Sequence, residues 1–396
     1  MYPYYSKQEI KKVSSILKKG RVNYWTGKEC NSFEKEFATY HELKFGVAVS
    51  NGSVALEIAL KSLKLENDYH AIVTPRSFII SASAINNTNG VPVFADVDVN
   101  GNLYLDSIKK NITPKTKVVV LVHLYGHPAN ALEIKKYLKK KKIFLIEDCS
   151  HAHGGIFKNR KIGSFGDLSI WSFCNEKIIS TGGEGGMICT NNLTIFKRCW
   201  SIKDHGKSFD KSKKKIKNYG KFRWLHENYG SNFRMTEMQA GIGRIQLKRL
   251  DYQLKKRELL AKKIYQVFKY FVIKKLFEEP NFKCFDCPKS KNNFFCNNCR
   301  FTFYRFNILL NNSESRNKLL RKLISNKINC GSGYNAEIYK ERFYKKNKKL
   351  VSNIVMSKDI GNRSIAFTID PYLNTDQIKK YLKNLKKTLK LFFRKY

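Results

Sequence analysis

The sequence predicts an α/β protein in which helices cover both faces of a largely parallel β-sheet. From residue 45 onward, short apolar runs of strand length alternate with stretches of helical periodicity, and this alternation is typical of parallel sheets connected by helices. The 396 residues exceed the size at which one hydrophobic core stops growing, so we expect two domains. Hydrophobic residues at 42% and aromatic residues at 13% suffice for a buried core and exclude a disordered chain.

Apolar residues at helical spacing predict two N-terminal helices, over residues 7–19 and 33–40. The strands of the sheet are expected where short apolar runs follow, at residues 47–49, 71–74, 91–94, 118–122 and 143–146. A helix over residues 54–63 follows the first of these strands. Because ligands of open α/β sheets bind beyond the carboxyl ends of the strands, polar residues directly after these runs are candidates for a functional site.

The second half of the chain predicts a smaller α+β domain. A long helix from residue 236 to about residue 271 carries the chain out of the first domain. Beyond it we expect a strand over residues 301–310 and a closing helix from residue 375 into the basic end. We therefore place the large domain at residues 1–255 and the small domain at residues 256–396.

The chain is strongly basic, with 75 Lys and Arg against 32 Asp and Glu and a net charge of +43. Such a charge favours nucleic acid, anionic membrane surfaces or phosphorylated small molecules as partners. The lysines are spread along the chain, and no zinc-finger, arginine-rich or RNA-recognition pattern accompanies them. We interpret most of the charge as solvated lysines, with a smaller part at a basic active-site entrance, and expect no nucleic acid partner. A basic regulatory or nucleic-acid-binding protein on an enzyme fold is the alternative from another class.

Targeting signals are not visible in the sequence. No apolar segment approaches the length of a membrane span, and the N-terminus lacks the charged start and apolar stretch of a signal peptide. We therefore expect a cytoplasmic protein without a membrane span. The ten cysteines would be reduced in that compartment, so pairs of them indicate metal ligands or unligated thiols before disulfides.

One lysine, Lys177, lies between a short apolar run that ends at Phe173 and a glycine-rich turn over residues 182–186. This order predicts a strand, a tight loop that holds the lysine, and a second strand. An amine beside a rigid sheet and partly shielded from water loses its proton more easily, and a neutral amine can form a Schiff base with an aldehyde cofactor. Spacing alone would fit a solvated loop lysine equally well, because lysine is common throughout the chain.

The segment resembles the active-site segment of the DegT/DnrJ/EryC1/StrS family of sugar aminotransferases, which use pyridoxal phosphate. The family pattern is Ser-Phe, a few variable residues, Lys, then Thr-x-Gly-Glu-Gly-Gly, and the matching residues are Ser172, Phe173, Lys177, Thr181, Gly183, Glu184, Gly185 and Gly186. Three further segments resemble the family in its own order, at residues 49–56, 146–154 and 232–240. One short motif is weak support, whereas four motifs in order are strong support.

The resemblance implies the aspartate-aminotransferase-like type I fold, with a mostly parallel seven-stranded sheet in the large domain. It also implies an enzyme that moves an amino group from an amino acid, with L-glutamate as the expected donor, to a nucleotide-linked keto sugar. Such a reaction would serve surface polysaccharide or other glycan biosynthesis. A sugar dehydratase is the alternative within the family, but those relatives replace the lysine by histidine, and Lys177 is present.

Two residues carry the chemistry that the resemblance implies. Lys177 would hold the cofactor aldehyde and later move the proton between substrate and cofactor carbons. Asp148, which follows the strand at 143–146, would pair with the pyridine nitrogen of the cofactor. A carboxylate at that position keeps the nitrogen protonated and lets the ring accept electrons. Without the motif, Asp148 would be interpreted as a helix cap or turn residue.

The resemblance implies further cofactor contacts. Gly52 and Ser53 lie where a strand turns into a helix, so their backbone N–H groups and the serine hydroxyl can bind the cofactor phosphate. Ser172 matches the second phosphate ligand of the family. Phe78 and His151 are expected to cover the two faces of the cofactor ring, although Phe78 alone would equally suit a core position.

Asn232 matches an asparagine that reaches the phosphate from the neighbouring subunit in relatives. The resemblance therefore implies a homodimer with two shared active sites. From the sequence alone, a polar loop residue would explain Asn232 equally well.

Four cysteines in the small domain do not belong to the family pattern. Cys284, Cys287, Cys296 and Cys299 form two Cys-x2-Cys pairs separated by an eight-residue gap. Two such pairs can close a tetrahedral structural zinc site away from the cofactor. The gap is shorter than in the usual zinc ribbon, so zinc binding and unligated reduced cysteines both remain open.

Overall fold

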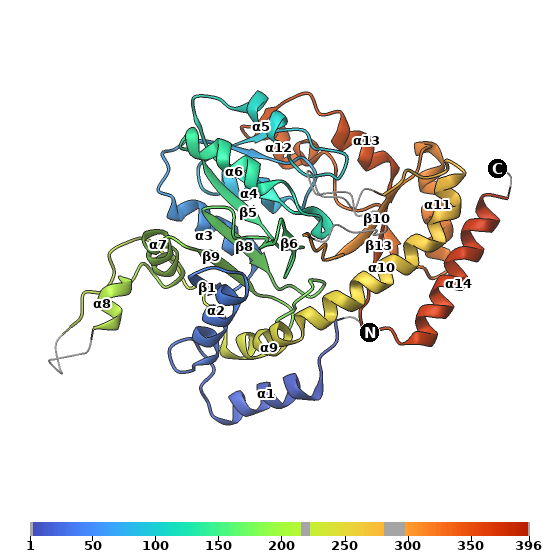
Figure 1. The fold of residues 1–396 in the computed structure, drawn as a ribbon. Helices are drawn as coiled ribbons and strands as arrows, with labels where there is room; N and C mark the ends of the chain where they lie inside the picture. The colour runs from blue at the N-terminus through green and yellow to red at the C-terminus, as the bar shows by residue number, and fades with distance from the viewer. Residues whose placement is uncertain (1–2, 215–221, 281–297, 395–396) are drawn as a thin grey trace.

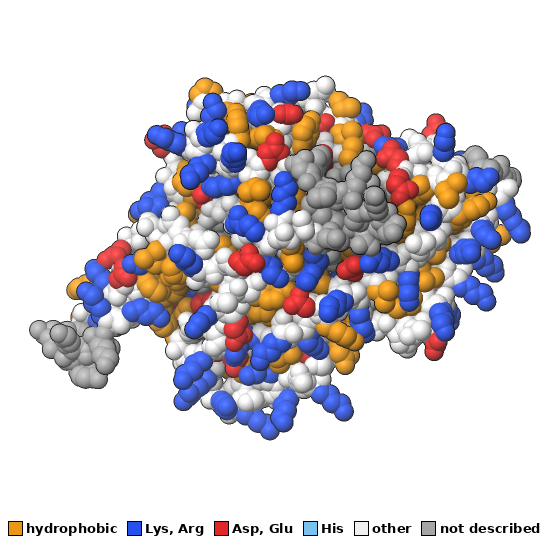
Figure 2. Space-filling view, viewed as in Figure 1, with side chains coloured by type: hydrophobic (Ala, Val, Ile, Leu, Met, Phe, Trp, Pro, Cys, Tyr) orange, Lys and Arg blue, Asp and Glu red, His pale blue; other side chains and the backbone are white. Residues whose placement is uncertain are grey.

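The computed structural model describes residues 3–214, 222–280 and 298–394 of the chain (Figure 1). A central β-sheet carries helices on both faces, and a second, smaller sheet lies at one end beside three long helices of the C-terminal part (Figure 1). Among the described residues, no helix is long and apolar enough to cross a membrane. Lys and Arg side chains are scattered over most of the visible face rather than gathered in one patch (Figure 2).

The central sheet has eight strands in the order β1-β9-β8-β5-β4-β2-β3-β12. Seven of them come from the first half of the chain, namely β1 (Phe45–Val49), β2 (His70–Val73), β3 (Val91–Phe94), β4 (Thr116–Val122), β5 (Phe144–Asp148), β8 (Leu168–Ser172) and β9 (Gly186–Thr190). β9 is antiparallel to β1 and β8, and the other pairs are parallel. The predicted α/β fold with a mostly parallel sheet is therefore confirmed, and β12 (Leu350–Val351) adds an eighth strand beside β3.

Two hydrophobic cores lie on the two faces of the sheet, because successive strand residues point to opposite sides. In β4, Val119 and Leu121 belong to one core, and Val118 and Val120 belong to the other. The first core includes α2 (Glu29–Tyr40) and α6 (Ala131–Lys140), and the second includes α3 (Gly52–Ser62), α4 (Ile80–Asn86) and α7 (Leu193–Lys203). The remaining short elements of this half are α1 (Lys7–Lys18), α5 (Leu105–Asn111), η1 (Leu124–Gly126), β6 (Ile156–Phe157), β7 (Arg160–Lys161) and α8 (Phe209–Lys213).

The single helix predicted over residues 236–271 is two helices, α9 (Glu237–Lys248) and α10 (Leu250–Ile273), so this prediction was wrong. The break lies at Arg249, whose N–H bonds back to the Gln246 carbonyl at 3.1 Å and whose guanidinium pairs with the buried Glu9 of α1. α9 packs against α1 and α2, whereas α10 runs on to the second sheet. α9 and α10 therefore take directions that are set by different packing partners. The spacing of apolar residues along the chain does not reveal such a change of direction.

The C-terminal part contains an antiparallel sheet of β10 (Arg305–Leu309), β13 (Ser364–Thr368) and β11 (Cys330–Gly331), with β13 in the centre. Its helices are α11 (Ser313–Ser325), α12 (Arg342–Lys346), α13 (Met356–Arg363) and α14 (Thr375–Phe392), with the turn η2 (Ile338–Lys340). The predicted strand and closing helix are present, and the division of the chain at residue 255 stays a prediction. The first core continues into this part through residues such as Phe306 and Phe367, so the two halves share buried surface.

Candidate active site

The fold brings distant residues together at the carboxyl ends of the central strands. A cavity of about 580 Å³ lies there. The predicted cofactor-contacting residues that line it are Gly52, Ser53, Phe78, Asp148, His151, Ser172 and Lys177. Asn232 is the one predicted cofactor residue that does not line the cavity of its own chain.

Lys177 lies in the loop between β8 and β9, and hydrogen bonds close this loop on itself. The Phe173 N–H donates to the Gly185 carbonyl at 2.8 Å, and the Thr181 N–H donates to the Phe173 carbonyl at 3.1 Å. The turn needs glycine at Gly183, whose φ of +120° lies in a region that side chains rarely adopt. Lys177 Nζ lies 5.1 Å from the centre of the Tyr304 ring, so the amine is held at the cavity by a short, constrained loop.

Asp148 is the last residue of β5, and its side chain is buried at the cavity. Its Oδ1 accepts the Ser150 N–H at 3.0 Å. In the described part of the chain, no Lys, Arg or His nitrogen lies within ion-pairing distance of this carboxylate. A buried carboxylate that has one hydrogen bond but no cationic partner is still costly, so Asp148 suits a protonated nitrogen supplied by a bound molecule.

The first residues of α3 and the end of β8 form a small cradle. A methyl group at Gly52 would lie 2.6 Å from the Ser172 Cβ, so only glycine allows this close approach. Asn51 caps the helix by accepting the Val54 N–H at 2.9 Å. The first N–H groups of a helix have no acceptor within it, and together with the hydroxyls of Ser53 and Ser172 they provide donors for an anion.

His151 follows β5 and is buried against two tyrosines. Its ring is parallel to that of Tyr304, with ring centres 4.3 Å apart and an angle of 5° between the planes. A hydrogen bond of 3.1 Å joins its Nε2 to the Tyr334 hydroxyl. Burial, together with the positive charge of Lys177, lowers the pKa of His151 well below its usual range, so the ring is neutral. Phe78, which is 60% exposed, contributes to the same cavity from the loop after β2.

Tyr304 and Tyr334 line the cavity and were not identified from the sequence. Both are held by the turn η1, where Tyr125 has a φ of +57°. The Tyr125 carbonyl accepts the Tyr304 N–H at 3.0 Å, and its hydroxyl accepts the Tyr334 N–H at 2.9 Å. No motif marks either residue, because their place depends on contacts between segments about 180 to 210 residues apart.

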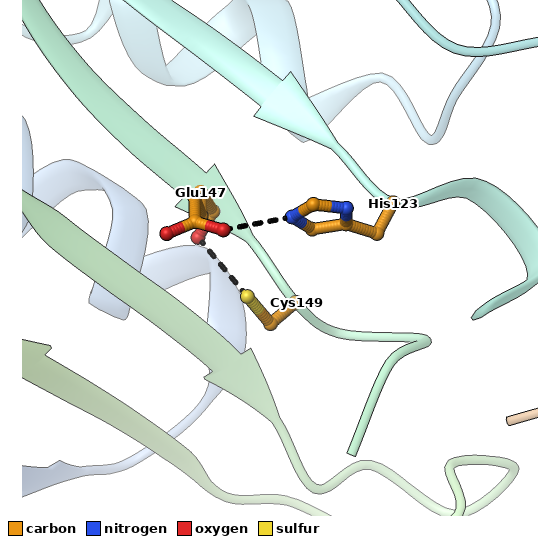
Figure 3. A group of neighbouring side chains, drawn as sticks. All are labelled: His123, Glu147 and Cys149. Carbon is orange, nitrogen blue, oxygen red and sulfur yellow. Dashed lines mark hydrogen bonds and ion pairs between the residues drawn. The ribbon is translucent and has the colours of Figure 1, made fainter. Parts of the chain in front are cut away.

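A buried group of His123, Glu147 and Cys149 lies at the carboxyl ends of β4 and β5, next to Asp148 in the chain (Figure 3). The Glu147 carboxylate accepts the His123 Nε2–H at 3.0 Å and three backbone N–H groups of the loop 163–166 at 2.6–3.1 Å. His123 Nδ1 accepts the Ala129 N–H, so the proton must be on Nε2. Because these lone pairs are already used, the group serves as a structural network that fixes β5 rather than as a metal site.

Asn232 and the segment around it lie on the surface. Asn232 is exposed and forms an isolated β-bridge with Asp204. In the ten residues before Asn232, large aromatic side chains are open to solvent, with Phe222 91%, Trp224 84% and Tyr229 100% exposed. Contiguous apolar patches exposed to solvent are typical of surfaces that interact with other molecules.

The predicted zinc ligands are only partly described. Cys284, Cys287 and Cys296 lie outside the described residues. Cys299 is buried, and its Sγ accepts the Lys158 N–H at 3.5 Å. The zinc prediction is therefore untested by the structure.

A family model described as the DegT/DnrJ/EryC1/StrS aminotransferase family matches residues 3–386. GDP-perosamine synthase from Escherichia coli O157:H7 is 37% identical over 235 residues, which are 59% of this chain and 61% of that protein. Spore coat polysaccharide biosynthesis protein SpsC from Bacillus subtilis is 35% identical over 261 residues, covering 65% of this chain and 66% of that protein. The chain thus spans about 61% of the length of the perosamine synthases it matches.

Solved structures match over almost the whole chain. The aminotransferase from Psychrobacter cryohalolentis superposes with a TM-score of 0.92 at 35% identity, covering 99% of both chains. PseC from Helicobacter pylori, an aminotransferase involved in the biosynthesis of pseudoaminic acid, gives a TM-score of 0.83 at 23% identity over 98% of both chains. The second likeness concerns the fold alone.

Proposed function

The chain belongs to the DegT/DnrJ/EryC1/StrS aminotransferase family, and we propose that it transfers an amino group from an amino acid to a nucleotide-linked keto sugar. L-Glutamate is the proposed donor, and surface polysaccharide or another glycan is the proposed destination of the product. The observation that carries the proposal is that Lys177, Asp148 and an anion cradle line one cavity. Relatives named as sugar transaminases support the substrate class.

Three features of the cavity fit pyridoxal phosphate. The buried Asp148 carboxylate has no ion-pair partner in the described part of the chain and suits the pyridine nitrogen. The first turn of α3, with Ser172 beside it, suits the phosphate. Lys177 offers an amine from a loop whose shape is fixed by hydrogen bonds. When bound, this cofactor supplies an electron sink for the charge that remains after a carbon–hydrogen bond breaks.

Three residues of the cavity would have separate roles in the reaction, and each role follows from the position of the side chain. Lys177 would hold the cofactor and then carry the proton that leaves the α-carbon of the donor, because its amine is fixed at the cavity. Asp148 would keep the pyridine nitrogen protonated. His151 stays neutral, so its ring can lie flat against the cofactor without adding a positive charge beside the protonated nitrogen.

We also propose a homodimer in which Asn232 serves the active site of the partner. Asn232 lies outside the cavity of its own chain, and the aromatic side chains of Phe222, Trp224 and Tyr229, which precede it in the chain, are exposed. A second copy packed on this surface would bury those side chains. The segment that contains these aromatic residues follows α8, and α8 projects from the body of the molecule (Figure 1).

The visible absorption spectrum of the purified protein tests the proposed function. We expect a yellow protein whose band disappears on addition of L-glutamate and returns on addition of 2-oxoglutarate. Mass spectrometry of nucleotide-linked keto sugars incubated with the protein and L-glutamate should then detect the amino sugar. A protein that gains no visible band with added pyridoxal phosphate would refute the proposal and favour the regulatory alternative.

A further inference from the structure

A second chamber of about 380 Å³ adjoins the cavity that contains Lys177. The two spaces share Glu176 and Tyr334 in their walls. The lining of the chamber is part polar and part apolar, and its polar residues include Asn329, Ser332 and Arg305. The positively charged guanidinium of Arg305 therefore lies in a chamber next to the cavity that contains the Lys177 amine.

Arg305 is held in place by three contacts. It begins β10 and faces Thr368 of β13 in register, and its Nη1 donates to the Thr368 hydroxyl. Its Nη2 donates to Glu176 Oε2 at 2.9 Å. Its Cζ lies 5.3 Å from the centre of the Tyr304 ring, the same ring that Lys177 Nζ approaches to 5.1 Å. The guanidinium and the reactive amine thus lie beside one aromatic side chain.

Glu176 is the replaceable member of the ion pair with Arg305. Its side chain is 65% exposed, whereas that of Arg305 is 23% exposed. An ion pair this open to water contributes little to stability, so Glu176 can swing into solvent at low cost. Arg305 keeps its position meanwhile, because the Thr368 contact and the register of β10 do not depend on Glu176. A carboxylate that arrives with a ligand can therefore take the place of Glu176.

We propose that Arg305 binds the side-chain carboxylate of a dicarboxylic amino donor, and that Glu176 occupies this position when no donor is bound. The inference rests on the proposed aminotransferase function. A planar guanidinium binds a carboxylate through parallel N–H donors, which gives both strength and orientation. A keto sugar brings no carboxylate, so the Glu176–Arg305 pair would close again for the second substrate. One site could thereby accept two chemically unlike substrates.

The test compares donors that differ in the side-chain carboxylate. The cofactor-loaded protein is mixed with L-glutamate or L-alanine, and loss of the visible band is followed against donor concentration. Charge-assisted hydrogen bonds predict that Arg305→Gln raises the half-saturating L-glutamate concentration about 10- to 100-fold. The response to L-alanine should change less than about 2-fold, because alanine leaves Arg305 unused. Arg305→Lys should fall between the wild type and Arg305→Gln.

Binding without turnover gives an independent measurement. Calorimetry with maleate, a dicarboxylate that cannot donate an amino group, should show weaker binding for Arg305→Gln and tighter binding for Glu176→Gln, which removes the competing carboxylate. Arg300→Gln is the matched control, since it removes another partly exposed arginine–carboxylate pair, with Asp251 at 2.6 Å, outside both cavities. This control should bind maleate as the wild type does.

Equal losses for L-glutamate and L-alanine, or unchanged maleate binding, would overturn the role of Arg305. That result is distinguishable from failure of the proposed function. If the wild-type protein reacts with L-glutamate, the aminotransferase proposal stands whatever Arg305→Gln does. If the wild type reacts with neither donor, the proposed function fails first.

Discussion

Replacing Glu147 with glutamine would test how the buried network that Glu147 forms with His123 and the loop 163–166 stabilises the fold. Glu147 Oε1 accepts two N–H groups of the loop 163–166 at 2.8 and 2.6 Å, and Oε2 accepts one more at 3.1 Å together with the His123 Nε2–H at 3.0 Å. Glutamine keeps one oxygen and replaces the other by an NH2 group. Whichever oxygen is replaced, the two N–H groups that it accepted would then face another hydrogen-bond donor. His123 cannot compensate by changing its tautomer, because its Nδ1 already accepts the Ala129 N–H.

The size of the effect follows from these contacts. Two hydrogen bonds to a charged acceptor are lost in a fully buried site, and each such bond is worth about 1.5–3 kcal/mol. We therefore expect Glu147→Gln to lower the free energy of unfolding by roughly 3–6 kcal/mol. Folded proteins have a total stability of about 5–15 kcal/mol, so the variant should be severely destabilised.

Urea unfolding followed by tryptophan fluorescence measures this loss, because the buried Trp171 lies in β8 next to β5. Glu258→Gln is the control, since Glu258 forms a partly exposed pair with Lys262 on α10, and it should change stability by less than about 0.5 kcal/mol. If Glu147→Gln is no less stable than the control, the network is not a stabilising one. A loss of stability on chelator treatment of the wild type would instead indicate a metal in this group.

Four further outcomes are expected. Asp148→Asn should slow loss of the visible band with L-glutamate by orders of magnitude, because an amide does not hold the ring nitrogen protonated; near-normal rates would leave it as a turn residue. Mixing inactive Lys177→Ala and Asn232→Ala protomers should restore activity, since one site of the mixed dimer has both residues; no recovery after confirmed subunit exchange contradicts sharing. Protein prepared without a histidine tag should contain about one zinc per chain if the cysteines at 284–299 bind it; absence of zinc with freely titratable thiols decides against it. Burial lowers the pKa of His41 to about 3, so His41 is protonated at a higher pH in the unfolded state than in the folded state. The free energy of unfolding should therefore fall as the pH drops below about 6.5. The midpoint of urea unfolding measures this, and a midpoint that does not change with pH would contradict it.

The sequence predicted those parts of the fold that depend on local pattern. β4 and β5 were recognisable because each is a continuous apolar run buried on both faces. Lys177 and Asp148 were recognisable because each lies within a motif that fixes its neighbours along the chain. Both line the cavity, as do Gly52, Ser53 and Ser172, the phosphate contacts proposed within one chain.

The features that were missed depend on contacts between distant segments. Tyr304 and Tyr334 enter the cavity because the strained turn at Tyr125 binds their backbone N–H groups, and nothing in their own sequence shows this. Arg249 ends α9 because the next helix follows a different packing partner. Arg305 falls within the predicted strand, but its position near Lys177 follows from contacts with Thr368 of β13 and with the Tyr304 ring that Lys177 also approaches.

The short strand β12 has a consequence for how the sheet meets other molecules. Without it, β3 would be the outer strand of the central sheet and would present unpaired N–H and C=O groups along its edge. Such an edge is a template for pairing with another chain. β12 covers it with only two residues, and the Ser352 N–H continues the cover by donating to the Phe94 carbonyl at 3.1 Å. The C-terminal part thus protects the edge of β3 from pairing with another chain. Because β12 follows β3 in the sequence, this protection arises only after the ribosome has synthesised the chain past residue 352.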